Sequence, residues 1–203
     1  MLVKDREMKI IGLTGGIGSG KSTVGKRMEE LKAVKLQMTD DIGHIALEQG
    51  TESYDKIIES FGKSFLKENG EIDRNLLGQL VFANQDKLEK LNAIIHPWVI
   101  DYLKRDIENT KKENKYLYYV VESAILFQTG LDRICEEIWY VDADEEIRRK
   151  RLQENRGYNV EKIDSIMAQQ RENEVFKKQC QVFILNNGEL SEVDTQIKKF
   201  LKE

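Results

Sequence analysis

The sequence predicts an α/β fold, a three-layer sandwich in which helices cover both faces of a central parallel sheet of about five strands. Apolar, β-rich runs alternate along the chain with charged stretches of helical spacing. Each run is almost continuously apolar, which is typical of parallel strands buried on both faces. The length of 203 residues suits one sizeable core with an inserted subdomain.

The strands are predicted in the following order. The first is Lys9 to Thr14 (KIIGLT), and glycines and then a helical stretch follow it. That stretch has Val24, Met28 and Leu31 on one face, as expected of an amphipathic helix. A short second strand covers residues 34–38, and strand-like runs return at 116–123 (YLYYVVES), 137–143 (EIWYVDA) and 181–187 (QVFILNN).

Residues 41–113 lie between the second and third predicted strands. They carry apolar and charged residues at helical spacing and no convincing strand, so we expect a helical insertion. Pro97 follows His96 and is expected to open a helix, because the first helical turn tolerates proline. The chain is thus predicted to be a single domain, 1–203, whose nucleotide-binding core combines residues 8–40 and 114–203.

The composition is that of an ordinary soluble protein, with 40% apolar and 33% charged residues and a net charge of −4. The net charge argues against a nucleic-acid partner, and no apolar run is long enough for a membrane span. The first seven residues (MLVKDRE) lack the apolar centre of a signal peptide, so we expect a cytoplasmic location. Cys135 and Cys180 lie far apart with no zinc-type spacing, and we expect buried, reduced thiols. Nothing in the sequence defines an oligomeric state.

The stretch GGIGSGKS, residues 15–22, lies between the first predicted strand and the first predicted helix. Its residues complete the pattern GxxxxGK[ST] of a P-loop in the strand-loop-helix context that gives the pattern its meaning. The glycines let backbone N–H groups point at phosphate oxygens, and the helix N-terminus adds its positive end. We expect Lys21 at the β and γ phosphates and the Ser22 hydroxyl on Mg²⁺. The residues expected to bind ATP are Gly16, Ile17, Gly18, Ser19, Gly20, Lys21, Ser22 and Thr23.

A P-loop occurs in kinases, switch GTPases and ATP-driven motors. A switch GTPase needs a guanine-reading NKxD, but here Asn114 and Lys115 are followed by Tyr and Leu. The DxxG of residues 40–43 comes too soon after the loop and is interpreted as chance. A motor would usually be larger and show a strand ending in paired acids with a hydrolytic Glu nearby, a combination that the sequence lacks. These observations favour a kinase.

A kinase of small molecules needs an acid that orients the acceptor hydroxyl, an acceptor-binding segment and an arginine-bearing lid. Asp40 follows the second predicted strand, so we expect it at the carboxyl edge of the sheet, where ligands gather in such folds. The neighbouring Asp41 is expected to cap the next helix. The helical insertion, 41–113, is the candidate acceptor-binding segment.

Residues 145–172 are the candidate lid. They begin with EEIRRKRLQENRG, in which Arg151 and Arg156, together with Arg148, are expected to converge on the transferring phosphate. Guanidinium groups there would stabilise the charge that develops during transfer. Arg149 and Lys150 are expected to lie on a solvated face. Lys21, Asp40, Arg151 and Arg156 are thus the candidate catalytic residues.

Several longer stretches carry a resemblance to a known family. GLTGGIGSGKSTV matches an extended form of the P-loop, and a more specific segment of the type FG…NGEIDR..L…VF…L..L..I.HP runs from Phe61 to Pro97. AILF at 124–127, the RL of residues 151–152 with a trailing Arg156, and NNG at 186–188 follow in order. From Lys9 onward, the chain resembles the dephospho-coenzyme A kinase family.

The resemblance implies transfer of the ATP γ-phosphoryl group to the ribose 3′-hydroxyl of dephospho-coenzyme A (dephospho-CoA), the last step of coenzyme A (CoA) synthesis. Asp40 would be the base or orienter for that hydroxyl, and Mg²⁺ would be bound at Ser22. Arg74 and His96 would contact or shape the acceptor site. The alternatives are a helix-end salt bridge for Arg74 and, for His96, packing and capping at a helix start.

The sequence departs from the family pattern at two acids. The family usually shows Asp-x-Asp after the second strand, but Met38 replaces the first acid and leaves Asp40. Gln128 stands where the family tends to have Glu after LLF. Two other functions stay open: a nucleoside or nucleotide monophosphate kinase, and a non-catalytic ATP-binding regulatory module.

Overall fold

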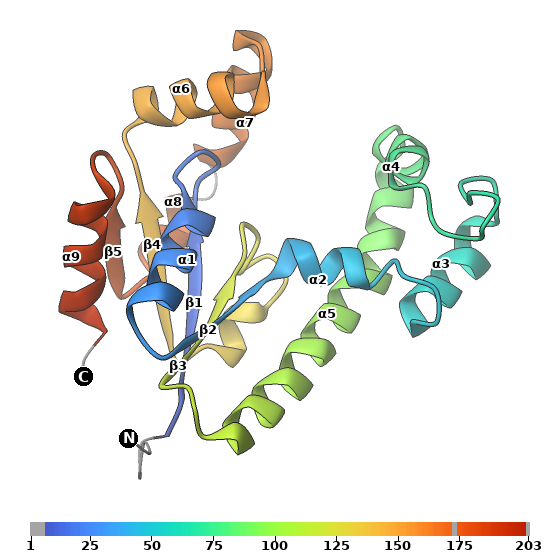
Figure 1. The fold of residues 1–203 in the computed structure, drawn as a ribbon. Helices are drawn as coiled ribbons and strands as arrows, with labels where there is room; N and C mark the ends of the chain where they lie inside the picture. Colours follow the sequence, from blue (N-terminus) through green and yellow to red (C-terminus); the bar gives the residue numbers. More distant parts are fainter. Residues whose placement is uncertain (1–6, 172–173, 202–203) are drawn as a thin grey trace. The chain divides into compact units, whose positions relative to one another are not determined.

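The computed structural model describes residues 7–171 and 174–201 (Figure 1). The chain forms two compact units. Unit 1 combines the chain up to Met38 with the chain from Thr110 onward, and unit 2 is Thr39–Asn109. Within the described residues, no helix is both long and apolar enough to cross a bilayer.

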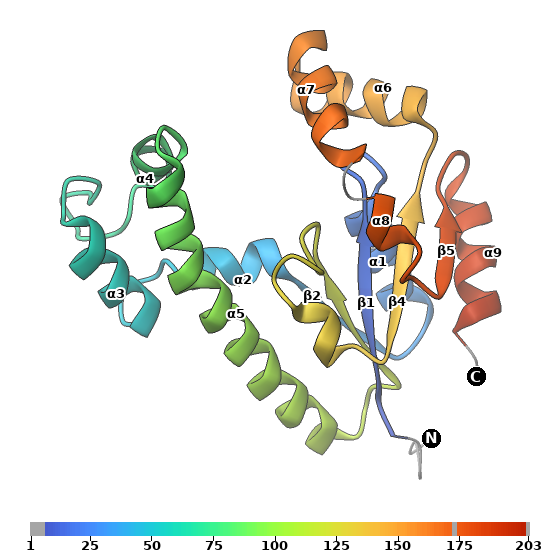
Figure 2. The same cartoon turned by 180° about the vertical axis from the view of Figure 1, so that it is seen from behind.

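Unit 1 is built on a five-stranded sheet in which every pair of neighbouring strands is parallel. The strand order is β2-β3-β1-β4-β5 (Figures 1 and 2). The strands are β1 (Lys9–Gly15), β2 (Val34–Met38), β3 (Tyr118–Glu122), β4 (Glu137–Asp142) and β5 (Val182–Leu185). The predicted fold class is therefore confirmed, and each of the five predicted runs corresponds to one strand, although β1 extends one residue beyond its run, to Gly15.

Helices and turns cover both faces of this sheet. On one face, α1 (Lys21–Leu31) packs beside α9 (Leu190–Phe200), where Arg27 Nε donates to Asp194 Oδ1 at 2.7 Å. On the opposite face, seen in Figure 2, lie the segment after β3, the 3₁₀-helix η1 (Leu131–Ile134) and α8 (Glu174–Lys177). The remaining helices of unit 1 are α6 (Glu145–Arg156) and α7 (Val160–Arg171).

The core of unit 1 lies between the sheet and the pair α1 and α9. Ile11 and Leu13 of β1, the central strand, are fully buried against Val24 and Met28 of α1. Trp139 of β4 is 1% exposed, and its ring meets the Phe200 ring edge-on at 5.8 Å. This packing fixes the carboxyl ends of β1, β3, β4 and β5, from which the loops of the candidate site begin.

Unit 2 is helical, with α2 (Thr39–Ile45), α3 (Glu52–Phe61), α4 (Arg74–Phe82) and α5 (Gln85–Glu113), whose last residues belong to unit 1. Its own core contains Ile57, Phe65, Ile72, Leu77, Val81 and Leu91. The Asp73 carboxylate caps α4 by accepting from two backbone N–H groups, at 2.9 and 3.1 Å. One isolated antiparallel bridge, Leu66 with Ile72, closes the connection between α3 and α4.

Two local predictions in this region are wrong. Pro97 does not open a helix but lies inside α5, since buried side chains at helical spacing continue on both sides of it, from Leu91 to Val99 and Leu103. The cost of one missing backbone donor there is outweighed by this burial. Asp41 is not a cap, because α2 begins at Thr39 and both acids lie in its first turn.

Candidate active site

The loop between β1 and α1 depends on glycines at two positions. Gly20 is the N-cap of α1 with φ of 87°, and a Cβ there would overlap the amide nitrogen of Asn186. Gly15, with φ of 152°, pairs with Val141 of β4, and a Cβ would overlap the Val141 carbonyl oxygen. Glycine alone satisfies both constraints, so the loop lies close to β4 and to the end of β5.

Lys21 and Ser22 begin α1 next to the loop. Lys21 Nζ donates to the carbonyl oxygens of Gly15 and Gly16 at 3.0 and 3.2 Å, so its ammonium group lies over the loop. The exposed Ser22 donates through Oγ to Glu122 Oε2 at 3.5 Å. Glu122 is the last residue of β3 and is 6% exposed. The arrangement places an ammonium group, a hydroxyl and a buried carboxylate around one loop.

The candidate lid contacts the same loop through arginines of α6. Arg148 Nε donates to the Ile17 carbonyl oxygen at 2.9 Å. Arg151 Nη1 lies 3.4 Å from the carbonyl oxygens of both Gly18 and Ser19. The two arginines are three residues apart and share one face of the helix.

Three other charged residues of α6 point elsewhere. Lys150 is exposed and lies 3.9 Å from Glu154, as expected of a solvated face, whereas Arg149 is half-buried and pairs with Glu145 and with Asp164 of α7. Arg156 is the last residue of α6 and is exposed. Its side chain forms no hydrogen bond or ion pair with any residue in the described part of the chain.

An apolar cluster fastens α6 and α7 to the loop. Leu152 of α6 packs with Ile163 and Met167 of α7, and Ile17 of the loop packs against this cluster. Residues 145–171 therefore form a helical pair that contacts the loop through both apolar and polar groups. Residue 172, the end of the predicted lid, lies outside the described residues.

The remaining candidates lie in unit 2. Asp40 is the second residue of α2 and is exposed. His96 is half-buried in the interior of α5, so its alternative role at a helix start is wrong. Burial lowers the pKa of the His96 imidazole below its ordinary value, which favours the neutral ring at neutral pH.

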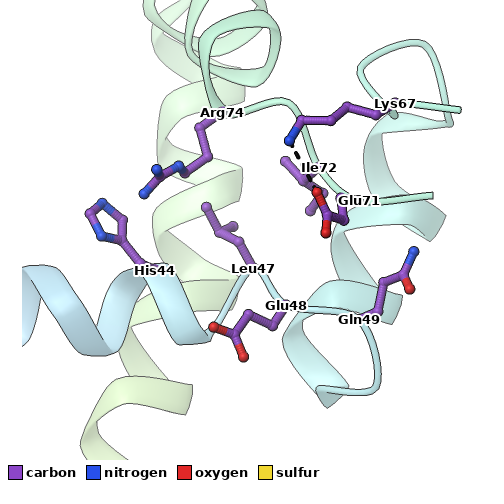
Figure 3. A pocket seen from close by; sticks show the side chains of 8 residues that line it. All are labelled: His44, Leu47, Glu48, Gln49, Lys67, Glu71, Ile72 and Arg74. Atoms are coloured by element: carbon purple, nitrogen blue, oxygen red, sulfur yellow. Dashed lines mark hydrogen bonds and ion pairs between the residues drawn. The ribbon is translucent and has the colours of Figure 1, made fainter. Parts of the chain in front are cut away.

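Arg74 lines a cavity of about 480 Å³ within unit 2 (Figure 3). Its guanidinium points toward the His44 imidazole, with Leu47 to one side, while Lys67 and Glu71 pair on the far side of the cavity at 3.0 Å. The alternative role of Arg74, a helix-end salt bridge, finds no partner in the described residues. The lining is His44, Leu47, Glu48, Gln49, Lys67, Glu71, Ile72 and Arg74, so neither Asp40 nor His96 contributes to it.

Comparison with known proteins assigns the family. The family model described as dephospho-CoA kinase matches residues 9–192. The chain belongs to the dephospho-CoA kinase family. A dephospho-CoA kinase of Fusobacterium nucleatum is 40% identical over 94% of this chain and 96% of its own length. That of Carboxydothermus hydrogenoformans is 35% identical over 97% of this chain and 94% of its own.

Solved structures share the fold of this chain. A Thermus thermophilus protein, TT1252, superposes with a TM-score of 0.79 at 26% identity and 97% coverage of both chains. The fold is also that of a dephospho-CoA kinase from Campylobacter jejuni, with a TM-score of 0.71 at 24% identity and 95% coverage of both chains. As a member of the dephospho-CoA kinase family, this chain is a transferase that uses ATP to phosphorylate dephospho-CoA in CoA synthesis.

Sequence reasoning missed two side chains of this kinase site. Glu122 is a single acid at the end of a buried strand, so a pattern that requires two acids at a strand end does not include it. The available signal was its place after the apolar run YYVV, beside the strand that carries the P-loop. Asn186 was quoted only as part of the NNG resemblance, although its amide donates to the Ser19 carbonyl oxygen at 2.8 Å.

The two thiols lie apart from the site. Burial raises the pKa of Cys135 to about 12 and that of Cys180 to about 11, so both stay protonated at neutral pH. In the described residues, no group of three or more His, Cys, Asp or Glu side chains is arranged to hold a metal ion.

Proposed function

We propose that this kinase transfers the γ-phosphoryl group of ATP to the ribose 3′-hydroxyl of dephospho-CoA, with ATP held by Gly16–Thr23. The observation that carries the proposal is the loop itself. Gly15, Gly18 and Gly20 have positive φ, which would let backbone N–H groups turn toward a phosphate chain, and α1 begins directly after the loop. Lys21 now contacts two loop carbonyl oxygens, and we propose that its ammonium group moves to the β and γ phosphates when ATP binds.

The residues next to Lys21 fit a bound Mg²⁺ ion. Mg²⁺ prefers oxygen ligands and keeps several waters, and the Ser22 hydroxyl and Glu122 carboxylate supply oxygens at adjacent positions. We propose that Ser22 ligates the ion directly and that Glu122 holds one of its waters. When bound, the ion neutralises charge on the β and γ phosphates.

Arg151 supplies positive charge on the lid side of the loop. A guanidinium beside the transferring group stabilises the negative charge that spreads over its oxygens. Residues 145–172 are proposed as the lid, which excludes water so that the phosphoryl group goes to the acceptor rather than to hydrolysis. The catalytic role of Arg156 stays a prediction.

The acceptor residues are proposed in the helical segment 41–113 and at Asp40 just before it. Asp40, two residues after the last residue of β2, would orient the 3′-hydroxyl and accept its proton. Arg74 would attract the anionic part of dephospho-CoA to its cavity, and the neutral His96 would shape the acceptor site by packing or hydrogen bonding. Both substrates are charged, water-soluble molecules, so we propose a cytoplasmic location for the reaction.

The test is a coupled ADP-release assay with Mg²⁺ and ATP against dephospho-CoA, adenosine, AMP and cytidylate, with mass spectrometry of the products. We expect turnover with dephospho-CoA, giving CoA, and none with an analogue that lacks the ribose 3′-hydroxyl. Phosphorylation of that analogue would overturn the proposed acceptor atom. Turnover only with a nucleoside or nucleotide would overturn the proposed substrate, and no turnover with any acceptor would favour a regulatory module.

A further inference from the structure

The carbonyl oxygens of the P-loop are held by hydrogen-bond donors from Gly15 through Ser19. Lys21 donates to the first two, Arg148 to Ile17, and Arg151 to Gly18 at 3.4 Å. The Ser19 carbonyl accepts from the Asn186 amide at 2.8 Å and from Arg151 at 3.4 Å. Each carbonyl of the loop therefore has a protein donor.

This pattern has a physical reason. A loop that turns its N–H groups toward phosphate must turn its carbonyl groups the other way, and carbonyls without a donor are costly away from water. In the proposed ATP complex, Lys21 moves to the phosphates and no longer serves the loop. The loop then depends on donors that do not bind phosphate, and Asn186 makes the shortest of these contacts.

Asn186 is placed to do this by its own strand. It directly follows β5, is 3% exposed, and is fixed to the sheet because its backbone N–H donates to the Asp142 carbonyl oxygen at 2.8 Å. Its amide nitrogen lies where a Cβ on Gly20 would be, so it packs directly against the start of α1. Its amide oxygen lies 3.5 Å from Arg151 Nη2.

We propose that Asn186 is a positioning residue for phosphoryl transfer, which holds the Ser19 carbonyl and the Arg151 guanidinium in a fixed relation. Its hydrogen bond to the Ser19 carbonyl oxygen keeps the end of the loop in the conformation that binds ATP. Its contact with Arg151 holds the guanidinium group of the lid next to the loop. The inference rests on the proposed function, because it takes the loop as the ATP site. A purely structural role, in which Asn186 only joins β5 to α1, is the competing explanation.

The test measures ATP dependence in two variants. Asn186→Ala removes both contacts of the amide. Asn186→Asp keeps the size of the side chain and the oxygen that accepts from Arg151. It replaces the amide nitrogen by a second carboxylate oxygen, which repels the Ser19 carbonyl oxygen. The matched control is Gln181→Ala, because this amide stands at the other end of β5 and accepts from the Ile138 backbone N–H at 2.7 Å. Thermal unfolding and the KM values for ATP and dephospho-CoA are measured for each.

We expect both Asn186 variants to raise KM for ATP about tenfold and to lower kcat, with KM for dephospho-CoA unchanged. Asn186→Asp should impair ATP use at least as much as Asn186→Ala, because the donated bond is replaced by repulsion. The Gln181→Ala control should lower the melting temperature without changing KM for ATP. A structural role alone would move stability and the active fraction but not KM for ATP.

Several outcomes overturn the inference. KM for ATP within about twofold of the parent in both variants would do so, as would full activity of Asn186→Asp. If neither variant folds, Asn186 is a stability residue and the inference fails. Lys21→Ala in the same assay separates this failure from that of the proposed function: unchanged ATP use in Lys21→Ala would show that the loop is not the ATP site.

Discussion

Replacing Gly15 by alanine should test the shape of the P-loop most directly. The φ of 152° at Gly15 lies in a region that is essentially restricted to glycine, and forcing another residue into it costs about 1–3 kcal/mol. The added Cβ would overlap the Val141 carbonyl oxygen, and it would lie 3.0 Å from Ser19 Oγ and 3.1 Å from the Val141 carbonyl carbon. Overpacking against a backbone that cannot give way costs about 1–3 kcal/mol more.

These two costs add to about 4 kcal/mol, a large part of the stability of a typical domain. For a chain of this size that is a fall of about 8–16 °C in melting temperature. The measurement is thermal unfolding of Gly15→Ala, with and without ATP, and ATP should also lose its stabilising effect because the loop is displaced. A shift below about 2 °C with ATP binding intact would refute the reasoning.

The matched control is Gly78→Ala in α4. Gly78 has an ordinary helical conformation, and its new Cβ would make normal contact with the Phe82 ring at 3.5 Å. Alanine is favoured over glycine inside a helix by about 0.5–1 kcal/mol, so this variant should unfold at a slightly higher temperature. A lower melting temperature for Gly15→Ala and a higher one for Gly78→Ala would show that the destabilisation at Gly15 comes from its conformation and its contact with β4.

Three further predictions concern the reaction and its pH dependence. Lys21→Ala and Asp40→Ala should each lower kcat/KM at least about a hundredfold, which corresponds to on the order of 3 kcal/mol of transition-state stabilisation. A folded Asp40→Ala variant with near-full activity would remove Asp40 from the base role. Arg151→Ala should lower kcat more than Arg156→Ala, because Arg151 contacts the loop; equal losses in the steady-state assay would contradict this order. Burial lowers the pKa of His96, so below pH about 6.5 the unfolded chain binds a proton that the folded chain does not, and the free energy of unfolding falls as the pH is lowered. Urea unfolding at a series of pH values should show a smaller fall for His96→Gln than for the parent. Equal dependence of the unfolding free energy on pH in the two proteins would count against the effect.

Much of the fold could be predicted because its signals are local. β1, β3 and β4 are apolar runs that are largely buried, and parallel strands covered on both faces need just that composition. The P-loop also follows from a short pattern whose glycines meet a steric demand visible in the structure at Gly15 and Gly20. Pro97 was misplaced because the rule for proline at helix starts is a preference, whereas burial along α5 is decided by packing.

The candidate site was harder to predict because its contacts join distant parts of the chain. Glu122 lies one hundred residues from Ser22 in the sequence, and the amide of Asn186 lies 167 residues from Ser19. No spacing rule connects such residues, since the order of strands in the sheet brings them together. The sheet order places β3 and β4 on either side of β1, so Glu122 at the end of β3 meets Ser22, and the Val141 carbonyl oxygen of β4 lies against Gly15.

The arginines of α6 show where periodicity could have given more. Arg148, Arg151 and Leu152 are three and four residues apart, and all three contact the loop or the cluster that packs on it. Arg156 is five residues beyond Arg151, which at 3.6 residues per turn places it about 140° around the helix from Arg151. A helix that continues to its last residue therefore separates these two guanidinium groups, and the structure ends α6 at Arg156, with Gly157 as its C-cap. The separation of Arg156 from Arg151 thus follows from helix geometry once the end of the helix is known.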